Sequence, residues 1–186
     1  ELKPTTKILP VPYVSEAPEG DWSGDWVNAC EEATIVMVDG FYAGKSTISV
    51  EEAKSRLLKF FAEQEIMYGS SKNSDSIKIQ NLISIYTNYV GKIKTNPTIS
   101  ELKQEIDNGH PVISLHRGFD LKNKNIPFSP VKSSYHTVVL LGYDDIAEEF
   151  IVHDPGDSKE GFERRYSYND FMFSTINFCS IESFFA

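Results

Sequence analysis

One cysteine of the chain lies at a position where a nucleophile could be built. Cys30 occurs in the stretch DWVNACEEATIVMV, in which apolar residues recur at helical spacing after the cysteine. Asn28 is a favourable N-cap, and Glu31, three positions later, would complete a capping box. Cys30 would then be the second helical residue, where free backbone N–H groups and the positive end of the helix dipole favour a thiolate. The position therefore predicts a nucleophilic cysteine.

The residues around Cys30 also allow a less reactive thiol. Glu31 and Glu32 place two carboxylates beside the sulfur, and negative charge raises the pKa of a thiol. Free cysteine is among the most often buried residue types, so an inert core thiol is the competing interpretation. Cys179, the second cysteine, stands in the apolar stretch FCSIESFF and is expected to pack in a strand. A disulfide between Cys30 and Cys179 is the remaining alternative.

A thiolate nucleophile needs a base, usually histidine, and the histidine needs an acceptor that orients it. His136 begins an apolar predicted strand in YHTVVLLGY, and Asp154 ends the next strand in FIVHDPG. If the two strands pair as a hairpin through the turn DDIAEE, the start of one lies beside the end of the other. Local rules thus bring His136 and Asp154 to one edge of a sheet. They do not show that the Cys30 helix faces this hairpin, and a plain strand-end histidine with a turn-forming aspartate is the alternative.

The other histidines and the acidic pairs are weaker candidates. His116 and His153 suggest a metal site with a nearby aspartate, but their spacing matches no compact zinc signature. We therefore expect no metal and no cofactor. Acidic pairs are expected on solvated faces or at helix starts, and they occur at residues 31–32, 51–52 and 148–149.

The overall composition limits what the chain can do. Its 186 residues, 40% of them hydrophobic and 12% aromatic, fit one globular domain over 1–186 with a substantial core. The formal net charge of -9 argues against a nucleic-acid surface, which needs a basic stripe. No apolar run approaches the length of a membrane span, so no integral membrane segment is expected. A peptide or protein substrate fits these limits, and we expect a monomer.

Capping signals and hydrophobic periodicity predict helices first and strands afterwards. The expected helices span residues 29–43, 49–64, 77–90 and 98–108, with a short one at 168–173. The expected strands span residues 111–116, 135–143, 150–154, 162–167 and 178–185, with a short one at 11–14. This order favours an α+β fold in which N-terminal helices pack on a C-terminal antiparallel sheet.

Five motifs, in order along the chain, resemble those of a known family: VPYVSEAP, NACEEAT, GHPVISLH, YHTVVLLGYDD and FIVHDPG. The family is the double-glycine leader peptidase-like domains, a branch of the papain-like cysteine peptidases. The resemblance runs from Val11 to about Gly156. It implies a papain-like fold in which Cys30 is the nucleophile, His136 the general base and Asp154 the orienting acid. It further implies hydrolysis of peptide bonds by a secreted or cell-surface protein of a prokaryote, with any leader outside this chain.

The chain departs from the usual sequence of this family near the cysteine. Gly-Pro-Thr is commoner where this chain has Glu-Glu-Ala, and many relatives carry a glutamine shortly before the cysteine as an oxyanion-hole donor. No glutamine precedes Gln64 here. Other donors must then serve, and the candidates are Asn28, the indole N–H of Trp22 or Trp26, and the backbone N–H of Cys30. Two other functions stay open: a catalytically degenerate domain that binds a surface or a partner, and a thiol acyltransferase or cross-linking enzyme that shares the acyl-enzyme step.

Overall fold

The computed structural model describes residues 6–70, 74–122, 135–157 and 160–182, with side chains as far as Ile176. The α-helices of this part are α1 (Cys30–Tyr42), α2 (Val50–Tyr68), α3 (Ser76–Tyr86), α4 (Ile99–Asp107) and α5 (Tyr168–Ser174). Two 3-10 turns accompany them, η1 (Gly24–Asn28) and η2 (Gly118–Asp120). The strands of the same part are β1 (Thr6–Ile8), β2 (Val90–Thr95), β3 (Val112–His116), β4 (His136–Asp144), β5 (Glu149–His153), β6 (Arg164–Ser167) and β7 (Thr175–Glu182).

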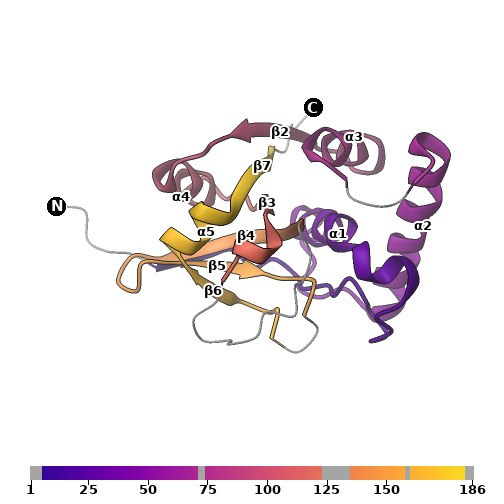
Figure 1. Cartoon of the computed structure of the whole chain (residues 1–186), viewed down its shortest axis with the longest axis horizontal. Helices are drawn as coiled ribbons and strands as arrows, with labels where there is room; N and C mark the ends of the chain where they lie inside the picture. Colours follow the sequence, from indigo (N-terminus) through magenta and orange to yellow (C-terminus); the bar gives the residue numbers. More distant parts are fainter. Residues whose placement is uncertain (1–5, 71–73, 123–134, 158–159, 183–186) are drawn as a thin grey trace.

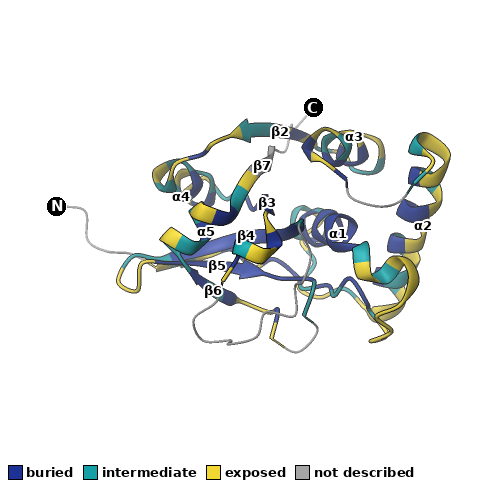
Figure 2. Cartoon of the chain, in the orientation of Figure 1, coloured by how far each residue is buried: buried dark blue, intermediate teal, exposed yellow. Residues whose placement is uncertain are grey.

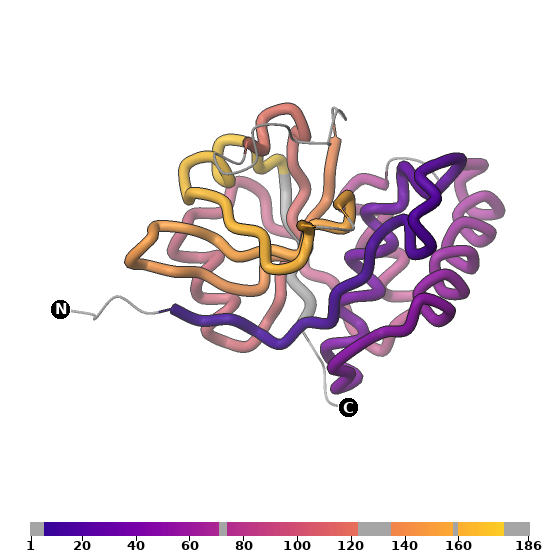
Figure 3. Tube along the Cα trace, turned by 90° about the horizontal axis from the view of Figure 1, so that it is seen from below, coloured from indigo at the N-terminus to yellow at the C-terminus, as the bar shows by residue number. Residues whose placement is uncertain are grey.

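The strands form one sheet with the order β2-β7-β3-β4-β5-β6, and β1 pairs with β4 outside this path. Every described pairing in the sheet is antiparallel. Figure 1 shows α1, α2 and α3 gathered at one end of the molecule and the strands, with α4 and α5, at the other. The N-terminal segment runs from the sheet to the helices, as Figure 3 shows. The predicted α+β fold is therefore confirmed.

Two helices begin where their capping residues predict. The Ser49 side chain accepts a hydrogen bond from the backbone N–H of Glu52 at the start of α2. At the start of α4, Thr98 and Glu101 form both hydrogen bonds of a capping box. Helix α2 runs past the predicted end at residue 64 and stops at Gly69, whose φ of 67° gives the left-handed geometry of a helix C-terminus. Local sequence thus fixes these starts because the cap and its acceptor are close neighbours in the chain.

Two predicted elements are wrong. The third helix does not reach residue 90: it ends at Tyr86, where the Thr87 hydroxyl donates to the carbonyl of Ile83, and residues 90–95 form β2 instead. The polar sequence of β2 does not indicate a strand. The segment is extended because it pairs with β7. The predicted short strand at 11–14 is absent, because prolines at 10 and 12 lack the N–H that a ladder needs. The first described strand is β1, which lies earlier.

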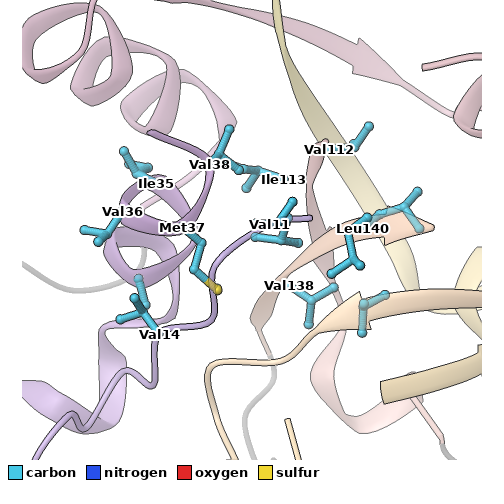
Figure 4. Packing of buried hydrophobic residues seen from close by; sticks show 14 of the residues in the cluster. Val11, Val14, Ile35, Val36, Met37, Val38, Val112, Ile113, Val138 and Leu140 are labelled. Carbon is cyan, nitrogen blue, oxygen red and sulfur yellow. The ribbon is translucent and has the colours of Figure 1, made fainter. Parts of the chain in front are cut away.

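Helix α1 lies in the middle of the hydrophobic core. Its residues 35–38 are fully buried, and α1 packs on β4 and α2. Figure 4 shows its apolar side chains beside those of the N-terminal segment and of β4, which include Val11, Val14, Val138 and Leu140. In Figure 2, α1 is almost wholly dark blue, whereas α2 has an exposed outer face. Glu31, in the first turn of α1, acts electrostatically on His136, the first residue of β4, so the N-terminus of the helix lies near the edge of the sheet at which β4 begins.

Candidate active site

The start of α1 differs from the predicted start. Cys30 is the first helical residue, and the N-cap position belongs to Ala29, which makes no side-chain capping bond. Asn28 instead ends the turn η1, so the predicted capping box of Asn28 and Glu31 is wrong. The reason is that η1 runs directly into α1 and leaves no extended residue between them, whereas a side-chain cap needs one. The Glu31 side chain is therefore available for other contacts.

The Cys30 thiol is buried against one of those carboxyls. Cys30 is 6% exposed, and its Sγ donates to Oε2 of Glu31 at 2.9 Å. Burial raises the pKa of the Cys30 thiol well above its ordinary value, and the carboxyls of Glu31 and Glu16 raise it further. The expectation that the helix start would favour a thiolate is wrong for this resting arrangement. The opposing expectation, that neighbouring carboxylates would raise the pKa, agrees with it.

The acidic residues after Cys30 are interior groups. Glu31 is 1% and Glu32 0% exposed, so the prediction of a solvated acidic pair at 31–32 is wrong. The Glu31 carboxylate accepts from the backbone N–H of Ser74 at 2.6 Å, and Glu32 accepts from the amide of Gln64. Gln64 in turn accepts from the Ser74 hydroxyl at 2.7 Å. Burial raises the pKa of both glutamates, which favours their neutral forms.

His136 and Asp154 lie together at the edge of the sheet. Strands β4 and β5 pair as the predicted hairpin, with Val139 opposite His153. Nε2 of His136 lies 2.7 Å from Oδ1 of Asp154, and both side chains are buried. A Cβ on Gly156 would come within 2.9 Å of the imidazole, so the backbone at this glycine packs directly against the ring. The hairpin therefore fixes the orientation of the imidazole.

Asp154 is held by groups that the sequence reasoning missed. Its Oδ2 accepts from Nη1 of Arg164 at 2.8 Å and from the hydroxyl of Tyr166 at 3.2 Å, and its Oδ1 accepts from the Gly156 N–H. Burial alone would raise the pKa of Asp154, but His136, Arg164 and the Gly156 N–H hold it well below its usual range. The sequence signal that could have found them is the alternation of side chains along the strand FERRYS, which places Arg164 and Tyr166 on the same face of β6.

The charge on Asp154 acts on His136 in return. Burial would lower the pKa of His136, but the Asp154 carboxylate and its hydrogen bond raise it above its ordinary value, with further help from Glu16 and Glu31. Because Asp154 is ionised, the ring N–H at Nε2 donates to it. Nδ1 is then the nitrogen that can take up a second proton, and the raised pKa of the ring favours this uptake.

Cys30 and His136 share the same acidic neighbours. No hydrogen bond joins the two residues in the part of the chain that the structure describes. Glu31, which accepts from the thiol, also acts electrostatically on His136, and Glu16 acts on both. The packing of α1 on β4 supplies the contact that local rules could not predict. The fold thus brings the start of α1 and the start of β4 around one cluster of carboxyls.

The predicted cleft residues lie around η1. Trp22 is 38% exposed, and Asn28 is half-buried at the end of the turn. Trp26 packs edge-on against Phe61, with ring centroids 5.3 Å apart, and lines a shallow surface hollow with Lys54. Among the described hydrogen bonds, none links these three side chains to Cys30 or His136. Their assignment to an oxyanion hole stays a prediction.

The remaining histidines hold the structure together. His116 pairs through Nδ1 with the Ser174 hydroxyl at 2.8 Å, and Nε2 of His153 donates to the Val11 carbonyl at 2.9 Å. Across the described ranges, no three His, Cys, Asp or Glu side chains are grouped so as to hold a metal ion. Cys30 is a free thiol. The side chain of Cys179 lies beyond the last side chain that the structure describes, that of Ile176.

Comparison with known proteins decides the family. The sequence profile of the Peptidase_C39 like family matches residues 8–176. The chain belongs to this peptidase C39-like family. The family resemblance inferred from the five motifs is therefore confirmed. Comparison with curated protein sequences gave no match.

Two solved structures share the fold of this C39-like protein. One, from Bacillus anthracis, is assigned as a C39-like peptidase, with a TM-score of 0.66 and 18% identity over 98% of this chain and 100% of that chain. The other is xylellain, a cysteine protease from Xylella fastidiosa, with a TM-score of 0.52 and 13% identity over 98% of this chain and 87% of that chain. The predicted papain-like arrangement of helices and antiparallel sheet is confirmed. No helix in the described ranges is long and apolar enough to cross a membrane.

Proposed function

We propose that the protein is a cysteine peptidase with Cys30 as nucleophile, His136 as general base and acid, and Asp154 as the residue that orients the imidazole. The observation that carries the proposal is the buried 2.7 Å contact between Nε2 of His136 and Asp154, on the strand that packs against α1. This contact uses one ring nitrogen and leaves Nδ1 for the thiol proton. Family membership and the fold shared with a cysteine protease support the same reaction class.

The reaction proceeds through a thioester. Nδ1 of His136 takes the proton of Cys30, and the sulfur electron pair attacks the carbonyl carbon of the peptide, so that the carbonyl oxygen becomes an oxyanion. The imidazolium then gives its proton to the leaving amine as the C–N bond breaks. A water molecule, deprotonated by His136, attacks the thioester carbon. The C–S bond breaks as the carbonyl reforms, and the imidazolium returns the proton to the departing sulfur. Asp154 stays ionised and stabilises the imidazolium.

Activation begins at Cys30, because its resting thiol donates to Glu31. A rotation about the Cα–Cβ bond between staggered positions turns Sγ away from Glu31. In the turned position the thiol proton meets the imidazole, and the pair becomes thiolate and imidazolium. We expect substrate binding to favour this position, since the sulfur must point at the substrate carbonyl, and not at Glu31, to attack it.

The test compares the wild-type chain with Cys30→Ala and Cys179→Ala. Each is incubated with a library of peptides, and mass spectrometry follows both cleavage products and acylation of the protein. We expect the wild type and Cys179→Ala to cleave and to carry the acyl group on Cys30, and Cys30→Ala to do neither. Cleavage that persists in Cys30→Ala would overturn the assignment of the nucleophile.

A second function, binding without cleavage, is favoured by one observation. The thiol of Cys30 is neutral, buried and bonded to Glu31, an arrangement that does not require reactivity. This function predicts that Cys30→Ala retains its affinity for a peptide partner and that no activated peptide ester acylates the wild type. Acylation of Cys30 by such an ester would exclude it.

A further inference from the structure

Glu16 lies beside the proposed reaction centre and has no role in the steps above. Its backbone N–H donates to the carbonyl of Pro155 at 3.0 Å, which fixes it next to the turn that follows Asp154. The residue is 6% exposed. The hydroxyl of the preceding Ser15 also reaches the Pro155 carbonyl, and the N–H of Ala17 donates back to that hydroxyl. The N-terminal segment therefore holds Glu16 firmly at the edge of the hairpin.

The Glu16 carboxyl is buried but has no hydrogen-bond partner among the described residues, whereas Glu31 and Glu32 each accept a hydrogen bond. Titratable groups face it from three elements. They are Tyr13 on its own segment, Cys30, Glu31 and Glu32 on α1, and His136 and Asp154 on the hairpin. Glu16 thus lies near both the nucleophile and the base, with its polar atoms unused.

The surroundings of Glu16 favour its neutral form. Burial raises the pKa of Glu16 to about 8 against the opposing effect of His136, while Asp154 and Glu31 raise it further. Near neutral pH most of the population therefore carries a carboxylic O–H, which is one hydrogen-bond donor. A carboxylic acid kept neutral by its site can donate to an oxyanion, whereas an ionised carboxylate would repel it.

We propose that Glu16 is a catalytic residue that donates its carboxylic O–H to the oxyanion formed when Cys30 attacks the substrate carbonyl. This inference rests on the proposed peptidase function. The proton stays on Glu16 throughout: when the tetrahedral intermediate collapses, the oxygen regains its carbonyl bond and the donor is unchanged. The carboxyl therefore acts by electrostatic stabilisation and not by proton transfer.

The test is the pH dependence of kcat and KM for the full chain and for Glu16→Gln and Glu16→Leu. Glutamine has the same shape and offers an N–H donor, but it does not titrate. We expect the wild-type kcat to fall as the pH rises through about 8. Glu16→Gln should keep kcat within about tenfold and lose this alkaline decline, and Glu16→Leu should lower kcat about 100- to 1,000-fold with little change in KM. Glu19→Gln, at an exposed glutamate of the same segment, should keep the wild-type profile.

Each other outcome has a defined meaning. An alkaline decline that persists in Glu16→Gln would overturn the donor role, as would a Gln variant as slow as the Leu variant, because a carboxylate would then be needed as a base or a cation ligand. A wild type that cleaves with no alkaline decline would overturn this inference alone. A wild type that neither cleaves nor is acylated would overturn the proposed function and this inference with it.

A measurement without substrate checks the same point. Thermal unfolding establishes that each variant is folded, and carbon-13 NMR follows the Glu16 carboxyl carbon, assigned by its loss in Glu16→Gln. The proposal requires a titration midpoint near 8. A midpoint near the ordinary value of 4.5 would overturn it.

Discussion

The hairpin side and the helix side of the site have opposite electrostatic arrangements. On the hairpin side, His136, Asp154 and Arg164 form a continuous series of charge-assisted hydrogen bonds. On the helix side, Cys30 lies among carboxyls, Glu16 and Glu31 included, whose pKa values burial raises. The first arrangement keeps charges ionised in a buried place, whereas the second raises the pKa of the acids that it buries.

This difference separates two requirements of a thiol enzyme. The orientation of the base is set by the folded hairpin, before any substrate arrives. The charge of the nucleophile is not set in the same way, because the Cys30 proton is shared with Glu31 and not with His136 in the resting site. We infer that orientation is permanent in this protein, whereas activation of the sulfur depends on an event at the start of α1.

The largest expected effect comes from removing the imidazole. His136→Ala takes away the only nitrogen base proposed for the reaction, and kcat should fall about 100- to 10,000-fold in a peptide cleavage assay at pH 7. His110→Ala is the control, because His110 pairs with Glu105 at the end of α4. An unchanged kcat in His136→Ala would mean that the hairpin side takes no part in the chemistry.

The next effect tests whether the hairpin side depends on its buried charges. Arg164→Leu leaves the Asp154 carboxylate buried with one cationic partner fewer, and the free energy of unfolding should fall by about 3–5 kcal/mol in urea titrations. The neighbouring Arg165→Leu should cost less than about 1 kcal/mol, because its side chain is 41% exposed. Equal losses in the two variants would contradict a special role for the buried pair.

A smaller effect tests the helix side. Glu31→Gln removes the carboxyl whose charge and hydrogen bond help to raise the pKa of Cys30. The pKa of Cys30 should therefore fall, and its alkylation by iodoacetamide at pH 7 should become about tenfold faster. Mass spectrometry of the modified peptide measures the rate, and exposed Glu51→Gln is the control. A slower rate in Glu31→Gln would instead identify Glu31 as the group that deprotonates the thiol.

The smallest expected effect concerns the pH dependence of stability, to which two buried histidines contribute with pKa values shifted in opposite directions. Burial lowers the pKa of His116 to about 3, so the folded protein binds fewer protons there than the unfolded chain, and stability falls as the pH falls below about 6.5. The loss due to this residue between pH 6 and pH 5 should be about 1 kcal/mol, and His116→Gln should abolish it. His136 has a raised pKa and contributes in the opposite direction, with stability lost as the pH rises. An identical acid slope in wild type and His116→Gln would refute the assignment.

The hairpin side could be predicted from the sequence, because its signals are local. Two apolar runs and one turn fix the register that brings His136 to Asp154. The starts of α2 and α4 were predictable for the same reason, since Ser49 and Thr98 contact residues three positions away. Because these contacts join residues close in the sequence, the helix starts can be predicted without knowledge of the tertiary structure.

The helix side could not be predicted, because its character comes from distant residues. In the interior, Glu31 accepts a hydrogen bond from Ser74, and Glu32 accepts one from Gln64 near the end of α2. Both partners are distant in the sequence. An acidic pair after a cysteine gives no sign of such packing, so the usual solvated interpretation was wrong. Strand β2 was missed likewise, since its polar sequence becomes a strand through pairing with β7.

The N-terminal segment has a consequence for the order of events during synthesis. Tyr13 donates to the carbonyls of Asp154 and Asp157, and Val11 accepts from His153, so residues near the beginning of the chain bond to partners more than 140 positions later. A ribosome releases the first partner long before it has made the second. The segment that carries Glu16 therefore cannot make these bonds until residues 153–157 have also been made and released, so a nascent chain cannot complete this site before that point.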